Sequence, residues 1–171
     1  TRNRTISSIE GSATSSAWLP DELYLDEYGA VSAETIASSF DDPAQANTFF
    51  QTWGWQENCY AYYAASSGSS TSEGIVYVDI GVHRFANASG AASALDYYCD
   101  VREAQMGLSE MAIAPIGDRS RAAQGLTSMG TEASVYVLVG NVVIRVSVMS
   151  VGIDPMQPAI TIAQSIMQSF G

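Results

Sequence analysis

The chain contains one histidine, His83, so any catalytic arrangement that needs an imidazole must use it. Nucleophilic catalysis by serine requires a histidine base that a carboxylate orients through a direct hydrogen bond. Asp79 lies four residues earlier on the same face of an expected strand, but strand rise separates the two side chains by roughly 13 Å. The residue types therefore predict no catalytic triad, and we expect His83 to be a partly exposed strand residue.

Acidic residues are plentiful, which leaves open a carboxylate pair of the kind that hydrolyses glycosidic bonds in an extracellular polymer. Asp42, Asp118 and Asp154, however, have simpler roles at helix starts or turns. The glycines are scattered and the chain has no lysine, so no phosphate-binding loop is predicted. We therefore expect a protein that is not an enzyme and that needs no organic cofactor or metal.

The only two cysteines, Cys59 and Cys99, have no cysteine or histidine neighbours at zinc-ligand spacing. Two interpretations remain, a disulfide or two buried thiols. A disulfide would close a loop of about 40 residues and restrict the unfolded chain by roughly 4 kcal/mol in the entropy model. We expect the disulfide, which would indicate an oxidising compartment.

Composition limits the class of protein. With 171 residues, 47% of them hydrophobic and 15% charged, the chain can form one domain with a sizeable core. It carries 18 acidic and 7 basic residues, a net charge of -11, which argues against nucleic acid as a partner. No segment approaches the roughly 20 apolar residues that cross a bilayer, so no membrane insertion of this segment is expected.

The small polar residues at the start of the chain predict a flexible linker over residues 1–17, with one domain over residues 18–171. Such a linker is typical of a domain tethered to an anchor outside this sequence. Residues 21–27 are acidic but lack the alternating ligands and fixed glycine of an EF-hand loop, so they are interpreted as a solvated surface. Ser32 is expected to cap a short helix, and Asp42 with Pro43 to start a second one.

Two hairpins dominate the rest of the pattern. Residues 59–65 and 75–85 are expected to pair as strands, and residues 134–139 and 142–149 flank Gly140 and Asn141, a strong signal for a two-residue turn. Helices should follow both hairpins, one capped by Ser89 and one started by Asp154 and Pro155. Residues 108–130 are expected to form only short strands and turns.

This order predicts an α+β fold, an antiparallel sheet built from two hairpin-plus-helix units with the helices packed on the sheet. The units span residues 59–105 and 134–170. A weak internal duplication would explain their common order, although any antiparallel α+β protein can show it.

The turn at Gly140 and Asn141 fixes the register of its hairpin and thereby suggests a recognition surface. One face should carry only β-branched residues and pack under helices, while Tyr136 should lie opposite Arg145 on the other face. Tyr77, Asp79 and His83 of the first hairpin could extend that second face. We interpret these five residues as a candidate ligand-binding surface, the alternative being a solvated or helix-covered face.

Three stretches resemble a pattern in exported bacterial proteins of unknown function: WGWQENCYAYY at residues 53–63, HRFANASGAASALDYY at residues 83–98 and GNVVIR at residues 140–145. From Leu19 to Phe170 the element order is also similar to small lipoprotein domains of the PsbP and LpqN type and to extracellular sensor domains of bacterial receptor kinases. The resemblance implies helices packed on an antiparallel sheet and transfers no catalytic residue.

Together these patterns favour a non-catalytic extracytoplasmic binding or sensor domain, secreted or membrane-anchored. Its partner would be an unknown small molecule, peptide or protein. Two alternatives remain open, a structural module for protein–protein interaction and a carboxylate-based hydrolase. A deep pocket with paired carboxylates would favour the hydrolase, and a flat apolar patch would favour protein assembly.

Overall fold

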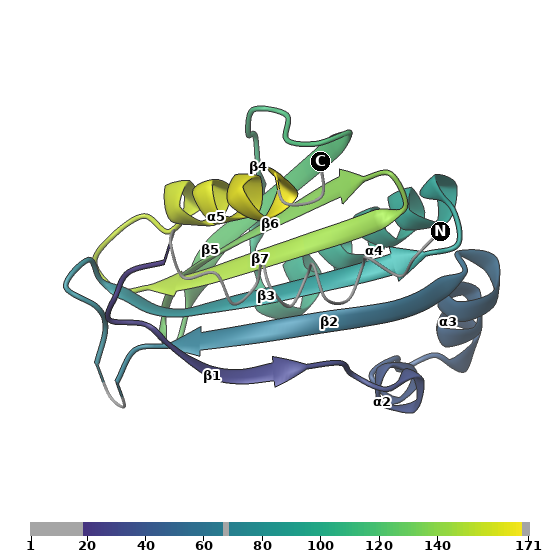
Figure 1. Cartoon of the computed structure of the whole chain (residues 1–171), viewed down its shortest axis with the longest axis horizontal. Helices are drawn as coiled ribbons and strands as arrows, with labels where there is room; N and C mark the ends of the chain where they lie inside the picture. The colour runs from purple at the N-terminus through teal and green to yellow at the C-terminus, as the bar shows by residue number, and fades with distance from the viewer. Residues whose placement is uncertain (1–18, 67–68, 169–171) are drawn as a thin grey trace.

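The computed structural model describes residues 19–66 and 69–168 and confirms the α+β fold (Figure 1). One seven-stranded antiparallel sheet runs through the molecule in the order β1-β2-β3-β7-β6-β5-β4. The predicted linker over residues 1–17 lies outside the described residues, as does Phe170. The strands are β1 (Tyr24–Gly29), β2 (Trp55–Ala64), β3 (Ile75–Phe85), β4 (Ser109–Met111), β5 (Arg119–Thr127), β6 (Gly130–Val139) and β7 (Val142–Ser150).

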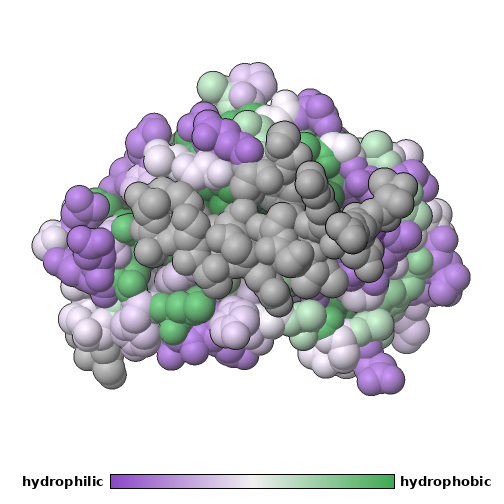
Figure 2. All heavy atoms as spheres, in the orientation of Figure 1, coloured by the Kyte–Doolittle hydropathy of each residue, from purple (hydrophilic) through white to green (hydrophobic). Residues whose placement is uncertain are grey.

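Helices cover both faces of the sheet. The last helix, α5 (Met156–Gln168), packs on β6 and β7 from one side, and α4 (Ala88–Met106) crosses the other side over β5, β6 and β7. Two short helices, α2 (Ala33–Ser38) and α3 (Pro43–Asn47), lie near one end of the sheet, and a π-helical turn over Thr48–Thr52 follows α3 (Figure 1). On the face that carries α5, hydrophilic residues surround small apolar groups (Figure 2).

Because both faces are covered, the molecule has two cores. The core on the α5 face is aliphatic and β-branched, whereas the core on the α4 face is rich in aromatic rings. The first includes Val78, Ile80, Val135, Ile144 and Ile162, and the second includes Phe49, Phe85, Leu95, Tyr136 and Val143. Of the two interpretations of the Tyr136 face, the structure therefore supports the helix-covered one for Tyr136 itself, which is fully buried.

The register predicted from the Gly140–Asn141 turn is confirmed. Val139 pairs with Val142, Val137 with Ile144 and Tyr136 with Arg145. Gly140 has a φ of 57°, a conformation that glycine adopts without the steric cost of a side chain. A two-residue turn of this kind fixes the register of the two strands. The register determines which side chains lie on the same face of the sheet and can therefore contact one another.

Two local expectations need correction. The N-cap of α4 is Asn87, whose side chain accepts a hydrogen bond from the Gly90 amide at 2.8 Å, and not Ser89. Residues 119–127 form a nine-residue strand where only short pieces were expected. The acidic side chains of residues 21–27 are exposed as expected, and part of this segment is strand β1, which pairs with β2. The residues of β5 and β1 do not alternate clearly between apolar and polar. These segments are therefore strands because they pair with a neighbouring strand, and not because of their own residue pattern.

The predicted disulfide is not formed. Cys59 belongs to the core on the α5 face, and Cys99 of α4 belongs to the core on the other face. The sheet lies between the two side chains, so no rotamer change can bring their sulfur atoms together. Burial raises the pKa of the Cys99 thiol to about 12, as expected for an unreactive core cysteine.

Charged residues fix α4 against β5. The Arg121 guanidinium contacts Asp96, Asp100 and Glu110 at 3.1, 2.9 and 2.8 Å, and only 15% of its side chain is exposed. Arg119 contacts Asp96 at 2.6 Å as well. The hydrogen bond from Arg121 holds the pKa of Glu110 below its ordinary value. This network positions α4 along the sheet and so positions the side chains that α4 directs at β3 and β7.

The two hairpin-plus-helix units place their helices on opposite faces of the sheet. In the first unit β2 and β3 precede α4, and in the second β6 and β7 precede α5. The common element order is therefore present, while an origin of the units by duplication remains a prediction.

Candidate functional site

A cleft opens on the α4 face of the sheet, and residues of α2, α4, β3 and β7 line it. It consists of two adjoining cavities. The helix-side cavity, of about 430 Å³, lies between α2, α4 and the sheet, and the sheet-side cavity, of about 310 Å³, lies between α2 and the strands β2 and β3. Both are lined by Ile36, His83, Tyr98 and Arg145.

Aromatic rings form the wall of the helix-side cavity. Phe40 stacks on Tyr97 with ring centroids 5.6 Å apart, and Phe49 lies 5.3 Å from Phe40 and 5.9 Å from Tyr98. Phe49 is fully buried and also packs against Phe85 of the core. Rings held by neighbours on several sides have little rotamer freedom, so this wall keeps its shape.

Arg145 of β7 lies on the floor where the cavities meet. Its Nη2 donates to Asp79 Oδ2 of β3, and its Nε is buried with no hydrogen-bond partner among the described residues. Gly81, which pairs with Arg145 across the strands, lets the guanidinium lie close to the sheet. A methyl group at Gly81 would lie 3.6 Å from Nε and Nη2 of Arg145 and 3.8 Å from Nε2 of His83. These nitrogen atoms therefore converge over one point of the floor.

His83 is held as a neutral hydrogen-bond donor. Trp55 Nε1 donates to His83 Nδ1 at 3.2 Å, which places the proton of the neutral ring on Nε2. Burial lowers the pKa of His83 to about 3, and the nearby Arg145 charge acts in the same direction. Near neutral pH the ring is therefore uncharged, and its Nε2–H can donate.

Tyr98 of α4 supplies a further polar group. Its ring lies 5.0 Å from the His83 ring, and its hydroxyl is buried with no hydrogen-bond partner among the residues that the structure describes. Burial raises the pKa of Tyr98 well above its ordinary value, so the phenol stays protonated. Most buried polar atoms of native proteins are hydrogen-bonded, so such atoms lining a cavity indicate a place where another molecule can bind.

Four of the five residues expected at a binding surface line this cleft: Asp79, His83, Tyr136 and Arg145. Tyr136 lies at the bottom of the helix-side cavity and is fully buried, so its role on the sheet is largely that of core. Replacing Tyr136 should therefore destabilise the fold, because removing a buried aromatic side chain costs about 3–5 kcal/mol.

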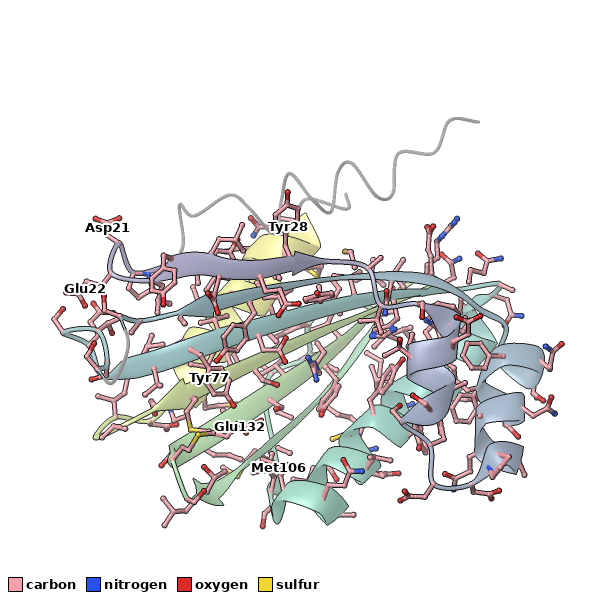
Figure 3. All side chains as sticks on the ribbon, turned by 90° about the horizontal axis from the view of Figure 1, so that it is seen from below. Asp21, Glu22, Tyr28, Tyr77, Met106 and Glu132 are labelled. Carbon is pink, nitrogen blue, oxygen red and sulfur yellow. The ribbon has the colours of Figure 1, made fainter. Side chains whose placement is uncertain are left out.

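Tyr77, the fifth residue, lies farther along β3 and outside the lining of the cleft. Its hydroxyl donates to Glu132 Oε2 at 3.4 Å, and Figure 3 shows the two residues on this face near Met106. Ser134 and Ser147 beside them are buried and joined through their hydroxyl groups at 2.7 Å. A row of buried polar residues thus continues from the cleft toward this end of the sheet.

Other lining residues were not identified from the sequence as binding residues. Ile36, Phe40 and Tyr98 fall at helical spacing in the sequence, where an apolar or aromatic residue is normally core. Only the arrangement of α2 against α4 shows that part of each helix borders a cavity. The signal available in the sequence was the surplus of tyrosine, with 9 residues, because tyrosine combines an apolar ring with a polar tip.

Neither His83 nor Asp79 is arranged for proton transfer near neutral pH. His83, with its lowered pKa, is a poor general base near neutral pH, and Asp79 is committed to Arg145. Among residues 19–66 and 69–168, no group of three or more histidine, cysteine, aspartate or glutamate side chains could hold a metal ion. No helix in the described part of the chain is long and apolar enough to span a bilayer.

Comparison with known proteins gives a likeness of fold. No family model matches the sequence, and no curated protein matches it. The extracellular domain of PknH from Mycobacterium tuberculosis has a similar structure, with a TM-score of 0.51 over 96% of this chain and 92% of that chain, at 10% sequence identity. The expected similarity to an extracellular domain of a bacterial protein is confirmed for the fold, and the likeness to the PsbP and LpqN type remains a prediction.

Proposed function

We propose that this chain is a non-catalytic extracytoplasmic domain that binds a small molecule in the cleft between α2 and α4. The observation that carries the proposal is the convergence of Arg145, His83 and Tyr98 where two cavities meet. Both cavities have volumes in the range of about 300–1,000 Å³ that is typical of ligand sites. Apolar walls with a few convergent polar groups are the usual composition of such sites.

The electrostatics of the cleft favour binding over catalysis. The imidazole of His83 is neutral near neutral pH. The charges of Asp79 on β3 and Arg145 on β7 neutralise each other. A hydrolase with two carboxylates would need one that is free to ionise and one held protonated near the scissile bond. The Asp79 carboxylate instead pairs with the Arg145 guanidinium.

An extracytoplasmic location is supported by the shared fold with the extracellular domain of PknH. The absence of a disulfide removes the separate argument that the cysteines would have supplied. The proposed location therefore depends on the similarity of fold and on the residue patterns of the sequence.

A fragment screen followed by NMR on isotope-labelled protein tests the binding function. Fragments that bind should shift the resonances of Ile36, Tyr98 and Arg145 more than those of residues elsewhere. Ala104→Trp should weaken their binding at least about tenfold, because Ala104 is an exposed residue of α4 that lines the helix-side cavity and a tryptophan there narrows it.

The matched control is Ala88→Trp, at the other end of α4. Ala88 is also exposed but does not line the cleft, so this variant should bind the same fragments with unchanged affinity. Fragments whose binding is equally insensitive to both substitutions, or a screen without hits in the cleft, would contradict the proposal.

A second candidate, a module for protein–protein interaction, is favoured by an exposed apolar group near the β5–β6 turn and after β7. Leu126, Met129 and Val151 are 80%, 60% and 54% exposed. Met129 and Val151 also border a shallow hollow of about 500 Å³ beside β2. Exposed apolar groups of this kind mark protein contact sites, and a fragment screen without hits in the cleft would favour this function.

A further inference from the structure

The polar groups of the cleft have more donors than acceptors. Arg145 Nε and the Tyr98 hydroxyl are buried without partners among the described residues, and His83 carries its proton on Nε2. The nearest acceptor, Asp79, already receives Arg145 Nη2 through Oδ2. A bound molecule would therefore complete the hydrogen bonds of this site by supplying an oxygen acceptor.

The charge of the site indicates which kind of acceptor fits. The Arg145 charge is balanced by Asp79, and His83 and Tyr98 are uncharged near neutral pH. A carboxylate would add a second negative group beside Asp79 in a partly desolvated cleft, in a chain with a net charge of -11. An amine could donate to the Tyr98 hydroxyl oxygen but would leave the Arg145 Nε and His83 Nε2 donors without an acceptor. An uncharged carbonyl oxygen meets neither difficulty.

We propose, on the basis of the function proposed above, that the cleft binds an uncharged carbonyl compound with an aromatic body. The carbonyl oxygen accepts hydrogen bonds where Arg145 Nε, His83 Nε2 and the Tyr98 hydroxyl converge. The aromatic body extends into the helix-side cavity against Phe40 and Tyr97, whose stacked rings offer an apolar wall.

Three probes that share a benzyl body and differ in the polar group test this inference: phenylacetamide, phenylacetate and 2-phenylethylamine. Titrations followed by NMR give their dissociation constants and report directly on the Arg145 Nε–H and His83 ring resonances. Phenylacetamide should bind at least about fivefold tighter than either charged probe, the effect of roughly one additional net hydrogen bond.

Two substitutions in the cleft have matched controls on the opposite face of the sheet. Tyr98→Phe removes one donor from the cleft and should weaken phenylacetamide binding about threefold or more. The control is Tyr63→Phe, which also removes a buried hydroxyl that has no hydrogen-bond partner among the described residues. Tyr63, however, belongs to the core on the α5 face. Tyr63→Phe should leave binding unchanged. Because both replacements remove only an unpartnered hydroxyl, both proteins should fold.

Arg145→Met and Arg84→Met form the second pair. Arg84 alternates with His83 along β3 and so points to the other face, where it pairs with Glu57 at 2.7 Å. The two arginine side chains are 28% and 30% exposed, so the substitutions remove comparable charges. Arg145→Met should abolish the preference for phenylacetamide over the other probes, and Arg84→Met should retain it.

The outcomes separate the two proposals. Tighter binding of phenylacetate or 2-phenylethylamine, or equal binding to Tyr98→Phe and wild type, overturns the carbonyl inference while the cleft remains a binding site. If none of the three probes binds, but fragments that have no acceptor oxygen bind in the cleft, the carbonyl inference is also overturned and the cleft remains a binding site. No binding of the probes and no fragment in the cleft overturn both.

Discussion

At the scale of single residues, His83 shows how burial changes what a side chain can do. Its Nδ1 accepts from Trp55, its ring packs beside Tyr98, and Arg145 lies near its Nε2. A proton added to this ring would lose the Trp55 hydrogen bond and face the guanidinium in a partly desolvated site. The one histidine of the chain is therefore a fixed donor and not a proton-transfer group near neutral pH.

This environment predicts a pH dependence of stability. The pKa of His83 falls from 6.5 to about 3 in the folded protein. Between these values only the unfolded chain binds the proton, so stability falls with decreasing pH by up to about 1.4 kcal/mol per unit. Urea unfolding of wild type and His83→Gln should show that wild type loses about 2 kcal/mol more than the variant between about pH 7.5 and pH 5.

Since His83 is the only histidine, no other imidazole can contribute to this difference. The comparison with His83→Gln also removes the contribution of the carboxylates, which titrate in both proteins. Parallel stability curves for the two proteins would show that His83 titrates in the folded protein as it does in water.

At the scale of elements, the start of α4 packs closely against the end of the preceding helical segment. Gly90, in the first turn of α4, is buried, and a methyl group there would lie 2.0 Å from the Trp53 carbonyl oxygen. The same turn is capped by Asn87. This contact joins α4 to the aromatic wall of the cleft, because Trp53 lies 6.0 Å from Phe49 between ring centroids.

Gly90→Ala should therefore destabilise the protein, although alanine is intrinsically the better helix former. Helix propensity alone would stabilise by about 1 kcal/mol, whereas forcing the methyl group against the backbone costs about 1–3 kcal/mol or more. Urea unfolding should show a net loss. Ser89→Ala, at an exposed neighbouring position, should change stability by less than about 0.5 kcal/mol. A Gly90→Ala variant more stable than wild type would show that α4 and residue 53 can move apart.

At the scale of the whole molecule, the sheet divides the interior into two cores, and the cysteines are distributed between them. A bond between Cys59 and Cys99 would require one side chain to cross the sheet. The fold therefore does not depend on an oxidising compartment, even if the protein is exported to one.

Thiol titration of unfolded, unreduced protein should find two thiols per chain, and the melting temperature should be the same with and without a reducing agent. The reason is that Cys59 and Cys99 are not joined, so a reducing agent has no disulfide to break in the folded protein. A titration that finds no thiol, or a clear fall in melting temperature on reduction, would show that the two cysteines are joined.

The sequence by itself determined the elements and registers that depend on neighbouring residues. Ser32 and Asp42 cap their helices as expected, and the Gly140–Asn141 turn set the pairing of Tyr136 with Arg145. Alternation along residues 75–85 correctly grouped Asp79 with His83 on one face. These features follow from turn geometry, capping hydrogen bonds and the two-residue repeat of a strand, all of which act over a few residues.

Only the tertiary structure decided how those faces are covered and what lies between them. The placement of α2 and α4 on one face of the sheet made a cleft around Arg145, and α4 brought Tyr98 beside His83 and helped to bury Tyr136. It also placed Cys59 on the far side of the sheet from its expected partner. These results depend on contacts between segments distant in the chain, and a residue pattern records which side chains are apolar or polar without recording which element will cover them.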